Sequence, residues 1–201
     1  IRTYTYPSPS LYPSATELAT GNILLQWEGT PSTRQPLIEI AANNFTATIV
    51  DTLSVWHGLS TITTLDNGQI LFAGVFGADI YDPQTQTSVS VSPMNTGLVR
   101  AASIRLPNGQ VIVSGGNSTL NGIGGENTIQ IYDPGQDTWS NGPNMSTGRS
   151  RHSILPLPNG ELVLIGGSSS SLLVDRYNPT NNTMNPPVDQ MSHSFFAALP
   201  L

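Results

Sequence analysis

One phrase of the sequence is repeated, and this repeat limits what the chain can fold into. Residues 150–167 read SRHSILPLPNGELVLIGG, and residues 100–116 read RAASIRLPNGQVIVSGG. In both, an Asn-Gly pair separates two apolar runs, which is the strongest short-range signal of a β-hairpin. Asn-Gly favours a type I′ turn, in which both central residues have positive φ. Further copies of the turn occur at 65–68 (LDNG) and, in degenerate form, at 18–21 (LATG).

A second repeated marker follows each hairpin. Its copies are 80–83 (IYDP), 131–134 (IYDP) and 176–179 (RYNP), and 40–43 (IAAN) hold the matching place in the first unit. Asp or Asn favours a turn, and proline cannot bond within a strand ladder, so a strand should end at each marker. A fourth short strand is expected to begin seven residues after each tyrosine, at Ser88, Trp139 and Met184.

These units predict an all-β fold with very little helix. Four antiparallel strands in about 40–50 residues make one blade of a β-propeller. We expect about four four-stranded blades, approximately at 11–55, 59–93, 98–144 and 149–190. Residues 1–7 alternate like the outer strand of a preceding blade, and 194–201 look like the inner strand of a following one. The blades are therefore expected to be part of a larger propeller, completed by the parent polypeptide or by another chain.

Composition excludes some partners. Only 10% of the residues are charged, lysine is absent, and the net charge is −6. Phosphate recognition needs clustered basic side chains, so nucleic acid is not an expected partner. No apolar run approaches the roughly 18 residues of a membrane span, so no membrane partner is expected. The chain has no cysteine, which excludes disulfides and thiolate metal ligands within it.

Sequons favour a secreted, extracellular glycoprotein. The triplet Asn-x-Ser/Thr, the acceptor of N-glycosylation, occurs at four positions in this Ser/Thr/Asn-rich chain. The expected glycosylation sites are Asn44, Asn117, Asn144 and Asn181.

Across about residues 11–191, the units resemble the kelch repeat, and their LPNG hairpins look most like the galactose oxidase and glyoxal oxidase group. That resemblance implies copper held by two tyrosines and two histidines, with one tyrosine cross-linked to a cysteine. The matching positions here are Tyr12, in LYPSA, and His193, in MSHS, where Ser192 replaces a tyrosine. The chain alone is therefore expected to hold no metal and no cofactor, with copper at Tyr12 and His193 as the alternative.

Loops entering the inner strands and loops after the Gly-Gly pairs should share one face of the propeller. A ligand is expected to meet this face, which should carry Tyr12, Trp56, His57, Arg100, Asn117, Glu126, Arg151 and His152. Arg100 and Arg151 occupy the place that Tyr12 has in the first unit. The Arg151-His152 pair has two interpretations: hydrogen bonds to carbonyls of the neighbouring blade, or contact with a ligand.

No catalytic residue is assigned, because no Ser/His/Asp triad or close carboxylate pair can be defended. Residues 122–125 (GIGG) lack the Lys-Ser/Thr and the helix of a phosphate-binding loop. Two functions remain open. The first is a non-catalytic binding or structural scaffold that takes a glycan or a protein. The alternative is a fragment of a copper radical oxidase that oxidises alcohols or aldehydes and releases hydrogen peroxide.

Overall fold

The computed structural model describes residues 14–26, 35–54, 56–120, 122, 124–167 and 173–190. These residues form four antiparallel sheets of four strands each, and in every sheet the strands neighbour one another in chain order. We call the sheets blades 1 to 4. The described residues contain no helix, and so none that could cross a membrane. The predicted all-β fold with four four-stranded blades is confirmed.

The strands of each blade run in order from the inner to the outer edge. Blade 1 comprises β1 (Ser14–Glu17), β2 (Ile23–Gln26), β3 (Pro36–Ile40) and β4 (Ala47–Thr52). Blade 2 comprises β5 (Thr61–Thr64), β6 (Ile70–Gly74), β7 (Gly77–Asp82) and β8 (Thr87–Val91). Blade 3 comprises β9 (Ala102–Arg105), β10 (Val111–Ser114), β11 (Ile129–Asp133) and β12 (Thr138–Asn141). Blade 4 comprises β13 (Ser153–Pro156), β14 (Leu162–Ile165), β15 (Leu173–Asn178) and β16 (Thr183–Gln190).

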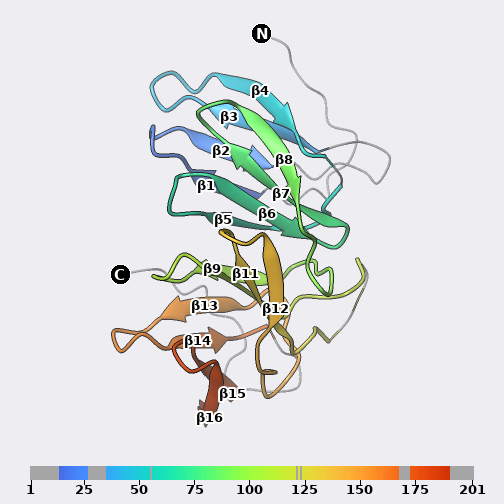
Figure 1. The fold of residues 1–201 in the computed structure, drawn as a ribbon, viewed down its shortest axis with the longest axis vertical. Helices are drawn as coiled ribbons and strands as arrows, with labels where there is room; N and C mark the ends of the chain where they lie inside the picture. Colours follow the sequence, from blue (N-terminus) through green and yellow to red (C-terminus); the bar gives the residue numbers. More distant parts are fainter. Residues whose placement is uncertain are drawn as a thin grey trace.

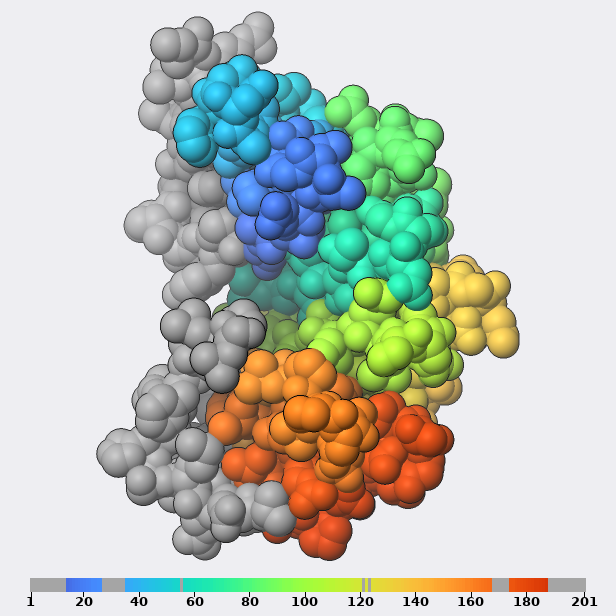
Figure 2. Space-filling view, turned by 90° about the vertical axis from the view of Figure 1, so that its left-hand side faces the viewer, coloured from blue at the N-terminus to red at the C-terminus, as the bar shows by residue number. Residues whose placement is uncertain are grey.

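The blades follow one another in chain order along the molecule. Figure 1 places blade 1 at one end of the long axis and blade 4 at the other, and Figure 2 shows the same order in space-filling form. The inner strands lie side by side, β1 beside β5, β5 beside β9, and β9 beside β13. The strands expected at 1–7 and 194–201 lie outside the described residues.

The hairpin between the first two strands of each blade differs from the expected type I′ turn. Leu65 donates its N–H to the carbonyl of Gln69, and Gly68 donates to Leu65, so three residues form the loop. In this loop and its described counterparts, only the glycine has a positive φ (83° at Gly68). The extra residue before Asn67 lengthens the loop by one, which favours a type I turn followed by a left-handed glycine. The hairpin positions were predicted correctly; the turn type was wrong.

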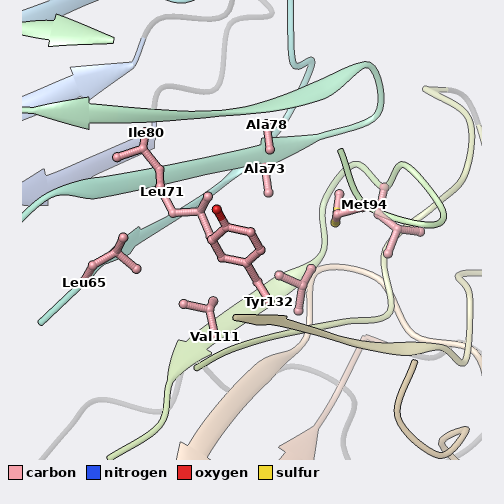
Figure 3. Close-up of a cluster of buried hydrophobic side chains, with 10 residues drawn as sticks. Leu65, Leu71, Ala73, Ala78, Ile80, Met94, Val111 and Tyr132 are labelled. Atoms are coloured by element: carbon pink, nitrogen blue, oxygen red, sulfur yellow. The ribbon is translucent and has the colours of Figure 1, made fainter. Parts of the chain in front are cut away.

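Both faces of each central blade are apolar because each is packed between two neighbours. Along β6, Leu71 and Ala73 face blade 3, whereas Ile70 and Phe72 face blade 1. Figure 3 shows side chains of blades 2 and 3 meeting around Tyr132, the tyrosine of the IYDP marker. Burial of apolar surface contributes about 25 cal/mol per Å². The inter-blade clusters therefore supply most of the stabilisation.

A buried polar residue on the third strand fastens the segment that crosses over from the preceding blade. In blade 2, Asp79 accepts the N–H of Ser54 at 2.8 Å. In blade 3, Gln130 accepts the N–H of Thr96 at 2.9 Å. In blade 4, Asp175 accepts the N–H of Ser146, also at 2.9 Å. These anchors fix the loops that lead into the inner strands, and those loops build the candidate site.

Candidate functional site

The site lies at the end of the blades opposite the Asn-Gly turns, where the inner strands begin. There the chain makes a series of hydrogen bonds from blade to blade. Arg100 donates its N–H to the carbonyl of Leu59 at 3.0 Å, and Arg151 donates its N–H to the carbonyl of Arg100 at 2.9 Å. These three residues occupy equivalent places before β5, β9 and β13, so the repeat itself brings Arg100 and Arg151 side by side.

Both arginines have a left-handed backbone, with φ of 57° at Arg100 and 56° at Arg151. This region is uncommon for residues other than glycine, and such strain concentrates at functional sites. The hydrogen bonds between blades hold the backbone in place despite that cost. The arrangement therefore fixes the backbone positions from which the side chains of Arg100 and Arg151 extend.

The two arginines line a pocket of about 240 Å³, which we call the arginine pocket. Its lining residues come from the loops entering β9 and β13 and the loops following β10 and β14: Arg100, Asn117, Gly122, Gly124, Ser150, Arg151 and Gly167. Three residues expected at the ligand-binding face, Arg100, Asn117 and Arg151, thus lie together in one pocket. Arg151 is exposed and Arg100 is half-buried.

Two predicted members of the face, Asn117 and Glu126, organise the loop after β10. Asn117 pairs with Val99 as an isolated bridge, is only 4% exposed, and accepts the N–H of Gly125 through its Oδ1 at 3.2 Å. Glu126 bridges the backbone of Arg149, and its carboxylate accepts the hydroxyl of Ser118 at 2.6 Å. Asn117 lines the pocket, whereas Glu126 is held beside it.

Trp56 belongs to an aromatic pair that the sequence did not reveal. Its ring stacks on Phe76, with centroids 5.3 Å apart and an angle of 29° between the planes. Phe76 lies in the turn between β6 and β7 and is 60% exposed. The indole N–H of Trp56 is buried without a hydrogen-bond partner among the described residues. The two-residue turn after β6 places Phe76 against Trp56. The only sequence signal for this contact is a large apolar side chain in a turn.

The two histidines expected at this face are buried instead of lining the pocket. His57 is fully buried, with Nε2 3.5 Å from a carboxylate oxygen of Asp79. His152 is 8% exposed, and its Nε2 lies 2.7 Å from the hydroxyl of Ser114. Burial, together with the neighbouring Arg149, lowers the pKa of His152 from 6.5 to about 4. His57 thus faces Asp79 of blade 2, and His152 of blade 4 contacts Ser114 of blade 3.

The structural arginine of this region is Arg149, not Arg151. Its side chain is fully buried, ion-paired with Asp175 at 2.9 Å, and donates to the carbonyl of Gly166 at 2.7 Å. Arg149, rather than Arg151, therefore makes the side-chain bond to a backbone carbonyl, and that carbonyl belongs to blade 4 itself. Arg100 also donates to a carbonyl, that of Leu120, at 2.7 Å.

The remaining expected sites divide by exposure. Asn44, Asn144 and Asn181 are exposed, whereas the sequon asparagine Asn117 is buried. Tyr12 and His193, the alternative copper ligands, lie outside the described residues.

The described residues do not offer copper a set of donors. No group of three or more His, Asp or Glu side chains among them is placed to hold a metal ion. His57 faces Asp79 in blade 2, and His152 contacts Ser114 of blade 3, so the two described histidines do not converge. Copper sites require several imidazole or thiolate donors around one point.

Three comparisons place the chain among known proteins. The kelch motif matches residues 102–146, which form most of blade 3. Galactose oxidase of Gibberella zeae is 31% identical over 80 residues, which is 38% of this chain and 11% of that protein. A copper-bound structure titled as a novel fungal alcohol oxidase of the AA5 family superposes with a TM-score of 0.54 at 13% identity. It covers 90% of this chain, which in turn covers 53% of that structure. The chain thus carries a kelch motif in blade 3, resembles galactose oxidase over part of its sequence, and has blades arranged as in the propeller of the alcohol oxidase.

Proposed function

We propose that these blades act as a non-catalytic binding module of an extracellular protein, with the arginine pocket and the Trp56–Phe76 pair binding a carbohydrate. One observation carries the proposal. Arg100, Asn117 and Arg151 come from two blades to line a single polar pocket, and Phe76 exposes an aromatic ring in the turn after β6. Sugars suit this pairing because their hydroxyls form hydrogen bonds while their C–H faces stack on aromatic rings.

The aromatic pair and the pocket are joined through Leu120. Gly58 has no side chain, and two methyl groups lie close to the point that a Cβ would occupy there. The methyl of Leu120 is 3.2 Å from that point, and the methyl of Val75, the neighbour of Phe76, is 3.6 Å from it. The carbonyl of Leu120 accepts a hydrogen bond from the guanidinium of Arg100. We therefore expect a ligand longer than one sugar residue to contact both features.

The relatives add support of a limited kind. Galactose oxidase acts, by its name, on a sugar, and it shares 31% identity over 80 residues with this chain. Because that segment is a small part of the enzyme, the shared property we carry over is sugar recognition by kelch blades.

The test is binding of the purified chain to an array of neutral and acidic glycans. Phe76→Ala is expected to weaken every hit about fivefold or more, because one stacked ring contributes about 1 kcal/mol. Phe45→Ala is the matched control: Phe45 is 83% exposed but lies in the turn between β3 and β4. An array without hits, or equal losses for the two variants, contradicts the proposal.

The copper radical oxidase is the second candidate, favoured by the match to galactose oxidase and by the fold of the alcohol oxidase. For the chain alone we expect no stoichiometric copper and no hydrogen peroxide from galactose or a small aldehyde. Metal analysis after incubation with copper, followed by a peroxide assay, decides between the two. Stoichiometric copper with peroxide production overturns the non-catalytic proposal.

Extracellular location predicts glycans on the exposed sequons. Passage through a eukaryotic secretory pathway should modify one or more of Asn44, Asn144 and Asn181, and should leave Asn117 bare because its side chain is buried and bonded to Gly125. A peptide N-glycosidase hydrolyses the glycosylated asparagine to aspartate, so peptide mass spectrometry after this treatment in heavy-oxygen water reports each site. A glycan on Asn117, or bare asparagines at the other three, counts against this assignment.

A further inference from the structure

We infer that the arginine pocket selects a carboxylate-bearing sugar, a uronic acid residue, over its neutral counterpart. This inference rests on the proposed carbohydrate-binding function and names the class of sugar. It is carried by the charges of the described arginines, by the donors that line the pocket, and by the backbone that presents them.

The arginines fall into two groups. Three of the described arginines are ion-paired, Arg105 with Asp66, Arg149 with Asp175 and Arg176 with Glu161. The other two, Arg100 and Arg151, have no carboxylate partner within the described part of the chain, and both line the arginine pocket. In a protein of net charge −6, the two guanidinium groups that have no carboxylate partner among the described residues thus lie at one place.

The side chains that line the pocket offer mainly hydrogen-bond donors. The Nε of Arg100 is buried without a partner among the described residues. The amide oxygen of Asn117 is occupied by the N–H of Gly125, which leaves its NH₂ group for a ligand. Ser150 adds a hydroxyl, and no lining residue is acidic. A site of this kind requires a ligand rich in acceptors, and a carboxylate offers about four lone-pair positions to two guanidinium groups.

The size of the pocket and the charge of the protein narrow the ligand further. A pocket of about 240 Å³ is smaller than typical drug-sized sites of about 300–1,000 Å³, so it suits one sugar ring. The net negative charge disfavours non-specific attraction of anions. Selectivity must therefore come from short, charge-assisted hydrogen bonds within the pocket.

The backbone at these arginines supplies a substitution that separates binding from folding. Glycine adopts a positive φ without the steric cost that Arg151 bears at 56°. Arg151 is exposed, so its side chain adds little to the core. Arg151→Gly should therefore keep or raise the melting temperature while it removes one guanidinium from the pocket. A merely structural arginine would not behave in this way.

The experiment measures binding of galacturonate, galactose and acetate to the full chain by calorimetry or NMR titration. We expect galacturonate to bind about tenfold or more tightly than galactose, which corresponds to about 1.4 kcal/mol. Arg151→Gly and Arg151→Gln should each remove most of that preference, and added salt should weaken galacturonate binding. Arg105→Gln, which removes the same charge at the Asn-Gly end of blade 3, should leave all affinities unchanged.

Each other outcome has a distinct meaning. Equal affinity for galactose and galacturonate overturns the acidic preference and leaves sugar binding intact. Acetate bound as tightly as galacturonate overturns sugar selection and makes the pocket a general carboxylate site. Binding of none of the three, with glycan-array hits also absent, removes both this inference and the proposed function.

Discussion

The segment that enters blade 4 and the segment that enters blade 3 are both held by a hydrogen bond to a buried polar side chain, but the two side chains differ in charge. Each is fastened by a buried polar residue of the third strand, Asp175 in blade 4 and Gln130 in blade 3. Three residues after the anchored N–H, blade 4 has Arg149, whereas blade 3 has the apolar Val99. The carboxylate of Asp175 is therefore paired with the guanidinium of Arg149, whereas the neutral amide of Gln130 has no cation at the equivalent position.

Blade 2 also carries a carboxylate at this position. Its third-strand residue is Asp79, and three residues after the anchored Ser54 stands His57, whose Nε2 lies 3.5 Å from an oxygen of that carboxylate. Burying an ion requires a counter-ion and hydrogen bonds, whereas burying an amide requires hydrogen bonds alone. The repeat thus keeps one geometric device, while the residue three positions after the anchored N–H differs from blade to blade.

The largest expected effect on stability comes from breaking the buried ion pair of blade 4. Asp175→Asn leaves the fully buried guanidinium of Arg149 without its counter-ion, and we expect a loss of about 3–5 kcal/mol in unfolding free energy. Urea denaturation measures it. The control is Arg105→Gln, which breaks an exposed pair with Asp66 and should cost less than about 1 kcal/mol. Equal losses for the two variants would show that the buried pair is no anchor.

The next effect concerns pH at the boundary between blades 3 and 4. His152 has a folded pKa of about 4 against 6.5 when unperturbed, chiefly because it is buried. As pH falls from 6.5 towards 4, the unfolded chain takes up a proton that the folded chain does not. Stability should therefore be complete above pH 6.5 and should decline by up to about 3 kcal/mol towards pH 4. His152→Gln should show a shallower decline than the parent chain in urea unfolding at a series of pH values; parallel curves contradict the assignment.

A smaller effect on stability is expected from placing a charge at the neutral anchor of blade 3. Gln130→Asp places a buried carboxylate in a blade whose crossover segment has Val99 at the position of Arg149, so we expect a loss of about 2 kcal/mol at pH 7. The loss should shrink at lower pH, because burial raises the pKa of such a carboxyl and protonation removes the charge. Gln136→Asp, in the exposed turn before β12, is the control and should change stability by less than about 0.5 kcal/mol. A loss that grows on acidification would contradict this reading.

Sequence patterning predicted the blades because local signals and the fold agree. Asn-Gly turns, Tyr-Asp-Pro strand ends and apolar runs on both strand faces each report a local constraint that the propeller repeats. The site was predicted only in part. Arg100, Asn117 and Arg151 line one pocket, and their contact with a ligand stays a prediction. The burial of His57 and His152 depends on how crossover segments pack, which no local pattern encodes. Phe76 was missed because a short turn between β6 and β7 gives no motif. Completion of the ring by further blades stays a prediction.

The turns after the third strands give the finest comparison between blades. The residue five positions after the marker tyrosine has a positive φ in each of blades 2 to 4, at Gln86, Asp137 and Asn182. Asp137 accepts the hydroxyl of Tyr132, and Asn182 accepts that of Tyr177, both at 2.9 Å. These short side chains tolerate the left-handed region and reach back to the ring.

Blade 2 lacks this bond, and this difference supplies the smallest predicted effect. The hydroxyl of Tyr81 is buried without a partner among the described residues, and burial beside Glu39 raises its pKa to about 12. Gln86→Asn should give the hydroxyl an acceptor and relieve the backbone at φ 55°, adding about 1 kcal/mol of stability. The reciprocal Asn182→Gln should cost blade 4 a similar amount, because it takes the acceptor from Tyr177. Thermal unfolding of both variants measures the pair of shifts. Two shifts of the same sign would contradict the assignment of this stability difference to the tyrosine bond.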